Sequence, residues 1–340
     1  MIRTGYETGS NHSLTASSLR RVVIALAVLL LLPVSGALYE WRAEVRDAAR
    51  FPPAGVLVDV GKHRLQVICI GEGAPTVFFE ASGFSNSTSS AAARTAIAAR
   101  TRVCSYDRVG VGWSDSSPRE MSIGALADDL AHLQDRAHLM PPFIIVASSI
   151  GGLPAEMFAR RYPDRVAGLV LLDAMTSAMI PIATARYNMG AVKTLCTTAW
   201  AVGRIGLIRL LDPWDLRASD SDASRRSAAL MYRAQPWNTL CALARAAPIT
   251  QQEFDAAPAL RRDVPLAVLS AEVAQGLLPR RLSGLIGRDD VRPELRAAHE
   301  RLARQSSRGS WRIIPGSGHL IANDRPEVVV DAVFQMLSSR

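Results

Sequence analysis

The chain has 340 residues, which allows one large domain or two smaller ones, and its hydrophobic fraction of 49% is enough to fill a sizeable core. Its net charge is +8, and only two of the 39 basic residues are lysines, so the charge is carried by arginines scattered along the chain. Because these arginines neither cluster nor alternate with aromatic residues, the composition argues against nucleic-acid binding and fits an anionic membrane surface better.

The first distinctive segment is an uncharged run at residues 22–39, VVIALAVLLLLPVSGALY. As a helix, eighteen residues rise about 27 Å, which is close to the thickness of a bilayer core. Arg20 and Arg21 precede the run, and the charges just after it cancel, so the basic excess lies on its N-terminal side. This bias predicts a cytoplasmic tail at 1–21, a single-pass transmembrane anchor that contacts membrane lipid at 22–39, and an extracytoplasmic chain from residue 40.

A cleaved signal peptide is the alternative for this segment. Ser35-Gly36-Ala37 resembles the small-residue site at which such peptides are cut. The 21 residues before the run are long for the basic region of a signal peptide, so we favour an uncleaved signal anchor. A linker at 40–55 then joins the anchor to the folded domain.

Beyond residue 55, short runs of β-branched and aromatic residues alternate with helical patterns. The predicted strands are 56–63, 64–71, 75–81, 101–107, 143–147, 166–173, 264–271 and 310–316, the first two forming a hairpin. The predicted helices are 89–100, 123–139, 151–162 and 326–337. Strands without clean alternation of polar and apolar residues are buried on both faces, as in a parallel sheet covered by helices. The sequence therefore predicts an α/β core made of residues 56–174 and 263–340.

Residues 175–262 interrupt the alternation and have a helical composition throughout. We expect them to form a helical cap over the core. Its methionines and tryptophans favour an apolar substrate cleft but fit the cap's own core equally well: Met175, Met179, Met189, Trp200, Trp214 and Trp237.

The stretch 143–167 changes from strand to helix at two serines followed by an isoleucine and two glycines. A hydroxyl nucleophile is presented on such a sharp, strained turn, where the residues two before and two after it must be small. Centring the turn on Ser149 places Ala147 and Gly151 there, whereas centring it on Ser148 places a valine and an isoleucine there. Ser149 is therefore the predicted nucleophile, at a helix N-terminus that favours developing negative charge. A serine that only caps the helix is the alternative.

Several segments between residues 56 and 340 resemble, in the same order, those of the α/β-hydrolase fold family, in particular its capped members with a serine nucleophile. YDRVGVGWSD (106–115) is similar to the family's Tyr-Asp-Arg-x-Gly-x-Gly-x-Ser-Asp loop. ASSIGGLPAEMFARRYPDRVAGLVLLDA (147–174) is similar to its nucleophile turn, following helix and next strand, and GSGHLIANDRPEVVVDAV (316–333) to its histidine loop and last helix. Two departures are Ala147, where Gly is commonest, and FFEASGF (78–84), which resembles a subgroup with Glu-Ala-Gly instead of His-Gly.

The resemblance implies an oxyanion hole built from two backbone N–H groups. By the family pattern, these belong to Ile150, just after the nucleophile, and to Gly83 in the loop after the third strand. Ser82 stands where the family pattern has a glycine, so this loop aligns with the family loop in more than one register. The backbone N–H of Phe84 is therefore the alternative second donor. A plain turn after a strand is the alternative for Ser82 and Gly83.

His319 is the predicted general base, which removes the Ser149 proton and later protonates the leaving group. It follows a predicted strand in a Gly-Ser-Gly-His loop just before the last helix. We expect the remaining histidines to lie before the anchor, at a hairpin tip or on solvated helix faces: His12, His63, His132, His138 and His299.

The third member of the triad follows either the sixth or the seventh strand. Asp173 ends the sixth at the carboxyl edge, where ligands bind in such sheets. After the seventh strand, Ala274 occupies the place where the family has Asp, and Glu272 lies two residues earlier. We favour Asp173 over Glu272, and we expect Asp107 to pair with the neighbouring arginine near the nucleophile turn.

These features predict a membrane-anchored serine hydrolase that cleaves an ester, lactone or related small apolar acyl substrate through an acyl-enzyme. The alternatives are an acyltransferase on the same triad, and a catalytically silent hydrolase fold that serves as a binding module. Epoxide hydrolase and haloalkane dehalogenase chemistries are disfavoured because they use a carboxylate nucleophile, and position 149 is Ser. No metal or cofactor is implied.

The four cysteines lack the spacing of a metal site, and an extracytoplasmic domain permits disulfides. Cys196 and Cys241, both in the cap, are the better candidate pair. Cys69 and Cys104 fall in the middle of predicted strands, where they are either neighbours or simply buried thiols, and we favour buried thiols.

Overall fold

The computed structural model describes residues 16–61, 63–83, 85–116, 121–186, 189–213, 222–273 and 292–339. Phe84, Trp214 and Ala274 lie outside these ranges, as does most of the predicted cytoplasmic tail.

One eight-stranded sheet forms the centre of the protein, in the order β1-β2-β4-β3-β5-β6-β7-β8. The strands are β1 (Val56–Asp59), β2 (Arg64–Ile70), β3 (Val77–Glu80), β4 (Val103–Tyr106), β5 (Phe143–Ser148), β6 (Val166–Leu172), β7 (Leu266–Ala271) and β8 (Gly309–Ile314). β2 pairs antiparallel with β1 and β4, and all other neighbours are parallel. The parallel strands therefore bring their carboxyl ends to one edge of the sheet.

Helices cover both faces of this sheet. One hydrophobic cluster joins the sheet to α3 (Ile123–Arg136), α4 (Gly152–Arg161) and α12 (Arg292–Ala303). The other joins it to α2 (Ala91–Ala98), α13 (Ile321–Asp324) and α14 (Pro326–Ser338). β5 contributes Ile145 to the first cluster and Ile144 to the second, so consecutive side chains are buried on opposite faces. This is the α/β architecture predicted from the uninterrupted apolar strands.

The insertion between β6 and β7 is helical, as expected. It comprises the short 3₁₀ turn Ser177–Met179, then α5 (Ile180–Arg186), α6 (Met189–Arg204), α7 (Leu207–Leu211), α8 (Asp222–Met231), α9 (Ala234–Arg245) and α10 (Ala247–Ala256). Trp237 packs in a small hydrophobic cluster between these helices, whereas Trp200 is 41% exposed. The two tryptophans therefore differ: one belongs to the cap's own core and the other faces outward.

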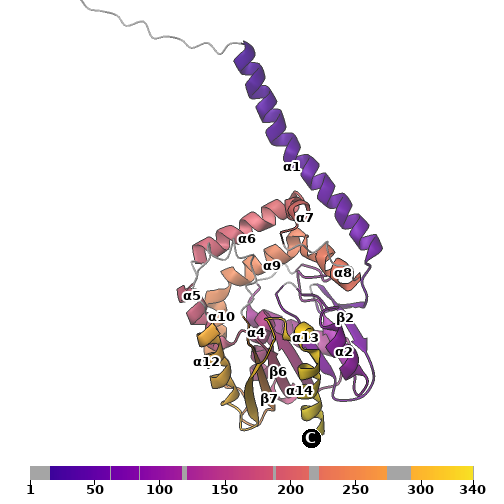
Figure 1. Cartoon of the computed structure of the whole chain (residues 1–340), viewed down its shortest axis with the longest axis vertical. Helices are drawn as coiled ribbons and strands as arrows, with labels where there is room; N and C mark the ends of the chain where they lie inside the picture. The colour runs from indigo at the N-terminus through magenta and orange to yellow at the C-terminus, as the bar shows by residue number, and fades with distance from the viewer. Residues whose placement is uncertain are drawn as a thin grey trace, which may run out of the picture.

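The apolar N-terminal segment lies within one long helix, α1 (Ala16–Arg50), which projects from the cap side of the molecule (Figure 1). Its 35 residues correspond to about 52 Å. Among the described residues, α1 alone is long and apolar enough to cross a membrane, and its most apolar stretch of 18 residues is not buried against the protein. Residues 40–50, which we expected in a linker, continue this helix.

The cysteine pairing differs from the expectation. Cys69 and Cys104 form a disulfide, whereas Cys196 and Cys241 are buried and unbridged. The reason is register: Cys69 on β2 lies directly opposite Cys104 on β4, with their Cα atoms 4.1 Å apart. Directly opposite residues in an antiparallel pair come this close at the positions that do not exchange backbone hydrogen bonds.

We predict that alkylation of the unreduced, denatured protein labels two thiols, and that reduction raises the number to four. Replacing Cys69 and Cys104 together by alanine should lower the free energy of unfolding by about 2–4 kcal/mol, because the bridge constrains a loop of about 35 residues in the unfolded chain. Mass spectrometry counts the labels, and urea unfolding measures the stability. Labelling of all four thiols without reduction would show that the bridge does not form.

Candidate active site

The Ser149 turn connects β5 to α4 through a short 3₁₀ segment, Ser149–Gly151. Ser149 has φ 55°, a left-handed conformation that non-glycine residues rarely adopt. A Cβ atom at Gly151 would lie 2.6 Å from the Ala81 carbonyl oxygen, and one at Gly152 would lie 2.4 Å from the Met175 carbonyl oxygen. The turn therefore requires glycine at both positions.

Ser149, His319 and Asp173 are joined by two hydrogen bonds. His319 Nε2 lies 2.8 Å from Ser149 Oγ, and His319 Nδ1 lies 2.7 Å from Asp173 Oδ2. Asp173 is also in a left-handed conformation, with φ 42°, and its other carboxylate oxygen accepts the Ala271 N–H at 3.1 Å. The three predicted residues are thus brought together from the ends of three strands.

The charge state of Asp173 sets the direction of these bonds. Burial acts to raise the pKa of Asp173, but the hydrogen bonds from His319 and the Ala271 N–H outweigh it, and the pKa is lowered. An ionised carboxylate only accepts hydrogen bonds. His319 therefore donates through Nδ1–H, and in the neutral imidazole this tautomer leaves Nε2 able to accept a hydrogen bond from the Ser149 hydroxyl.

Glu272, the alternative acid, has a different partner. Its Oε2 accepts the Gly316 N–H at 2.8 Å, and the Glu272 and Val273 N–H groups both donate to the Ser317 carbonyl. These contacts hold the loop that carries His319. In the structure Asp173, and not Glu272, contacts the imidazole.

The loop after β3 approaches the turn at the two predicted oxyanion donors. A Cβ atom added to Gly83 would lie 3.5 Å from Ile150 Cγ2, so the two residues are neighbours. Arg108 donates to the carbonyl oxygens of Ala81 at 3.0 Å and Ser82 at 2.7 Å. Because C=O and N–H point in opposite directions across a trans peptide, the Gly83 N–H points away from Arg108.

Arg108 does not pair with Asp107 as we expected. It forms a buried ion pair with Glu80, 2.9 Å between Nη1 and Oε1, and the Tyr106 hydroxyl contacts the other carboxylate oxygen of Glu80. Asp107 instead accepts hydrogen bonds from the backbone N–H groups of Ser87 and Trp113 and from a side-chain amide. The sequence signal for Arg108 was the motif at 106–115, but its partner on β3 is not adjacent in the chain.

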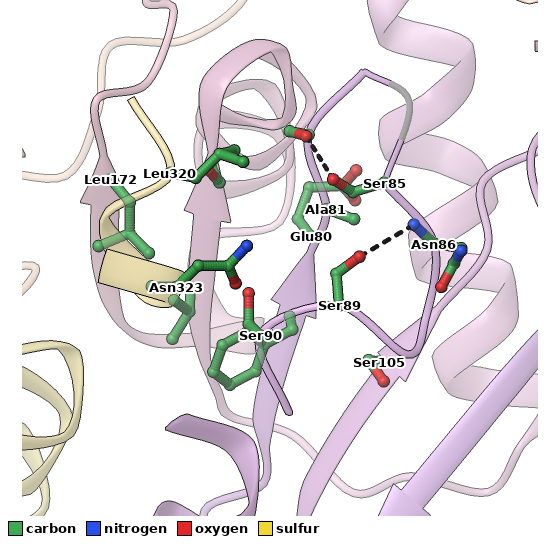
Figure 2. A pocket seen from close by; sticks show the side chains of 15 residues that line it. Glu80, Ala81, Ser85, Asn86, Ser89, Ser90, Ser105, Leu172, Leu320 and Asn323 are labelled. Atoms are coloured by element: carbon green, nitrogen blue, oxygen red, sulfur yellow. Dashed lines mark hydrogen bonds between the residues drawn. The ribbon is translucent and has the colours of Figure 1, made fainter. Parts of the chain in front are cut away.

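A small cavity of about 30 Å³ lies behind the nucleophile turn, under the loop that follows β3 (Figure 2). This is enough space for an ordered water molecule. Ser148 lines this cavity, whereas Ser149 contacts the imidazole. The two serines therefore face different surroundings. The other polar residues of the lining are Glu80, Ser82, Ser85, Asn86, Ser89, Ser90, Ser105 and Asn323.

Two further histidines are buried: His63, which lies at the predicted hairpin tip, and His299, which we expected on a solvated helix face. His63 is 6% exposed and lies 3.2 Å from the Asp129 carboxylate. His299, on α12, is 0% exposed; its Nε2 donates to the Ala174 carbonyl at 2.6 Å, and its Nδ1 lies 2.7 Å from Ser270 Oγ. Ala174 directly follows Asp173, so His299 helps to hold the strained residue in place.

Burial lowers the pKa of His299, although the Ala174 carbonyl and the Asp173 charge act in the opposite direction. The unfolded chain, with an ordinary histidine pKa of about 6.5, then binds a proton that the folded protein does not. The contribution of neutral His299 to the free energy of unfolding is therefore fully present above about pH 6.5 and is lost as the pH falls below that value. The free energy of unfolding falls by about 1.4 kcal/mol per pH unit in the range where His299 is protonated only in the unfolded chain.

We predict that His299→Gln has a lower melting temperature than the wild type at pH 7.5. Its melting temperature should then fall less than that of the wild type when the pH is lowered from 7.5 to 5.5. Differential scanning calorimetry at the two pH values measures both effects. His132→Gln, at an exposed position on α3, is the control and should keep the wild-type slope. An unchanged slope in His299→Gln would contradict the assignment.

Sequence comparison finds relatives of unestablished function. An uncharacterised protein of Schizosaccharomyces pombe is 40% identical over 74 residues, which are 22% of this chain and 14% of that protein. An uncharacterised vacuolar membrane protein of Saccharomyces cerevisiae is 36% identical over 74 residues, 22% of this chain and 12% of that protein. An uncharacterised Bacillus subtilis protein is 27% identical over 158 residues, 46% of this chain and 49% of that protein. The match therefore spans half or less of each of these relatives.

Solved structures of hydrolases share the fold. A thermophilic esterase from Thermogutta terrifontis is 24% identical with a TM-score of 0.59, covering 84% of this chain and 98% of its own. An enol-lactonase from Burkholderia xenovorans is 19% identical with a TM-score of 0.56, covering 83% and 100%. The epoxide hydrolase CorEH is 16% identical with a TM-score of 0.61, covering 84% and 98%.

The family model described as the alpha/beta hydrolase family matches residues 73–332, from just before β3 into the last helix. This range includes every residue of the candidate site as well as the cap. The chain belongs to the alpha/beta hydrolase family.

Proposed function

We propose that the protein is a membrane-anchored serine hydrolase that cleaves an ester, lactone or related acyl substrate. The observation that carries the proposal is the pair of hydrogen bonds from Ser149 through His319 to Asp173. The same series of hydrogen bonds from a hydroxyl through an imidazole to a carboxylate activates the hydroxyl as a nucleophile in proteins of unrelated fold.

The proposed first step is attack of Ser149 Oγ on the substrate carbonyl carbon while His319 Nε2 takes the hydroxyl proton. Asp173 accepts from Nδ1–H and stabilises the imidazolium that forms. The carbonyl oxygen, now negative, lies against the backbone N–H groups of Ile150 and Gly83. Collapse of this intermediate breaks the bond to the leaving alcohol, which receives the proton from His319, and leaves an acyl-serine.

In the second step, water gives a proton to His319 and its oxygen attacks the acyl carbon. Collapse of this intermediate breaks the bond to Ser149 Oγ, which takes the proton back from His319, and the acid is released. An alcohol in place of water would make the protein an acyltransferase. Hydrolysis is the simpler assignment because water needs no binding site of its own. Epoxide opening remains disfavoured, since it uses a carboxylate at the position that Ser149 occupies.

We propose further that α1 anchors the protein and that residues 40–340 are extracytoplasmic. The length and exposure of the apolar segment support the anchor, and the arginines before it support the orientation. The Cys69–Cys104 bridge is an independent support, because disulfides persist in oxidising compartments and are rare in the cytosol.

Replacing Ser149 by alanine should abolish both ester hydrolysis and covalent labelling by a fluorophosphonate probe, with a loss in kcat of roughly 10⁶-fold, as in protease triads. Ser148→Ala is the matched control and should keep most of both, because Ser148 lines the cavity behind the turn. Release of p-nitrophenol from a p-nitrophenyl ester measures hydrolysis, and in-gel fluorescence measures covalent labelling. A wild-type protein that the probe does not label would instead favour a silent binding module.

Asp173→Asn should lower kcat by about 10⁴-fold, because an amide at this position favours the wrong imidazole tautomer. Glu272→Gln keeps an acceptor for the Gly316 N–H and should change kcat by less than about tenfold. Steady-state kinetics on the same ester compares the variants. A larger loss in Glu272→Gln than in Asp173→Asn would reverse the two roles.

A further inference from the structure

The cap is held on α1 by a buried cluster of charges around Arg209. Its guanidinium donates to both carboxylate oxygens of Glu40 at 2.8 Å and to Asp47 at 2.7 Å. Arg209 is 8% exposed and Glu40 is 3% exposed. Burial acts to lower the pKa of Arg209, but the two carboxylates outweigh it and the pKa is raised. Because loss of one partner would leave an uncompensated buried charge, the cap has a defined position on this helix.

Close backbone packing determines at which residues of α1 the cap makes contact. A Cβ atom at Gly36 would lie 2.6 Å from the Ile205 carbonyl oxygen, and one at Gly206 would lie 2.7 Å from the Tyr39 ring. The turn between α6 and α7 therefore touches α1 in the last turn of the apolar run 22–39. If this run spans the bilayer, as the proposed function has it, the turn lies where the helix leaves the membrane.

The exposed side chains around this turn have the composition of a membrane interface. Leu210 is 62% exposed, Leu211 is 67% exposed, and two exposed tryptophans lie on α1 and α6. Exposed basic residues on the outer face of α6 suit an anionic surface. We define the cap membrane face as a set of exposed residues on α1, α6 and α7, of which Lys193 lies farther along α6 from the turn: Trp41, Lys193, Trp200, Arg204, Leu210 and Leu211. Tryptophan is enriched at membrane–water interfaces, and burying leucine side chains among the lipids strengthens binding to the membrane.

We propose that the cap membrane face rests in the interfacial region of an anionic bilayer, with Leu210 and Leu211 inserted among the lipids. The substrate is then an ester dissolved in the membrane rather than one free in water. Figure 1 shows α6, α7 and α9 on the side of the molecule from which α1 leaves, with the sheet beyond them. The cap therefore lies between the bilayer and the carboxyl edge that carries Ser149.

Two single-cysteine variants, each labelled separately, test the docking without reference to activity. In separate proteins, Leu211→Cys and Met140→Cys are labelled with an environment-sensitive fluorophore and reconstituted as full-length chains into vesicles of phosphatidylcholine and phosphatidylglycerol. Met140 is 79% exposed and lies just before the amino end of β5, at the opposite edge of the sheet. Quenchers attached to the lipid acyl chains should quench the label at 211 but not at 140. Equal quenching at both positions would overturn the proposal.

Kinetics then tests the substrate class. Leu210→Asp combined with Leu211→Asp should lower hydrolysis of a long-chain ester embedded in these vesicles by roughly tenfold or more, and leave hydrolysis of a water-soluble short-chain ester unchanged. Met140→Asp is the control and should change neither rate. Equal loss on both esters would point to damage to the cap and would overturn the lipid assignment.

The two hypotheses fail in different ways. If the wild-type protein hydrolyses neither ester and reacts with no fluorophosphonate, the proposed hydrolase function fails, yet quenching at position 211 still decides whether the cap membrane face meets lipid. If the enzyme is active but the label at 211 is not quenched, the hydrolase function stands and the docking is wrong.

Discussion

The hydrogen bonds of the candidate triad depend on the meeting of strand ends at one edge of a parallel sheet. Ser149 follows β5, Asp173 follows β6 and His319 lies five residues after β8, in chain segments that are far apart in sequence. Ser149 and Asp173 both have positive φ, which costs free energy for any residue other than glycine. The buried strands on either side hold these strained residues in place, so the core of the protein stabilises the geometry of the site.

A second set of buried contacts shapes the loop opposite the nucleophile. Glu80 ends β3 and Tyr106 ends β4, and the ion pair with Arg108 joins the ends of these two neighbouring strands. Burial raises the pKa of Glu80, while the charge and hydrogen bond of Arg108 act to lower it. The same guanidinium also binds the carbonyl groups of the following loop, so one buried cation orients both a carboxylate and the backbone that faces Ile150.

Features that depend on nearby residues could be predicted from the sequence. The strand runs, the helical cap and the small residues around Ser149 are local patterns, and the structure has them close to the expected positions. The resemblance to a family added the position of His319 and the approach of Gly83. The choice of Asp173 over Glu272 rested on the absent aspartate at 274, and the structure places the Asp173 carboxylate against the imidazole.

Features that depend on register between distant segments could not be predicted. Cys69 and Cys104 are 35 residues apart, and only the pairing of β2 with β4 places them opposite each other. The sequence predicts His299 on a charged helix face because α12 is rich in arginine and glutamate, but packing against β7 buries that one side chain. The partner of Arg108 was missed for the same reason, since Glu80 lies on another strand.

The attachment of both the cap and the core to α1 has a mechanical consequence. Arg209 binds the helix over two turns, from Glu40 to Asp47, and only five residues separate the end of α1 from the first strand of the core. The helix α1 is therefore attached to the cap through Arg209 and to the core through residues 51–55. A rotation of the cap away from the core at the segments that join them would pull Arg209 away from its carboxylates. Such a movement must either break this contact or tilt the whole helix, so the angle of α1 and the position of the cap on the core are coupled.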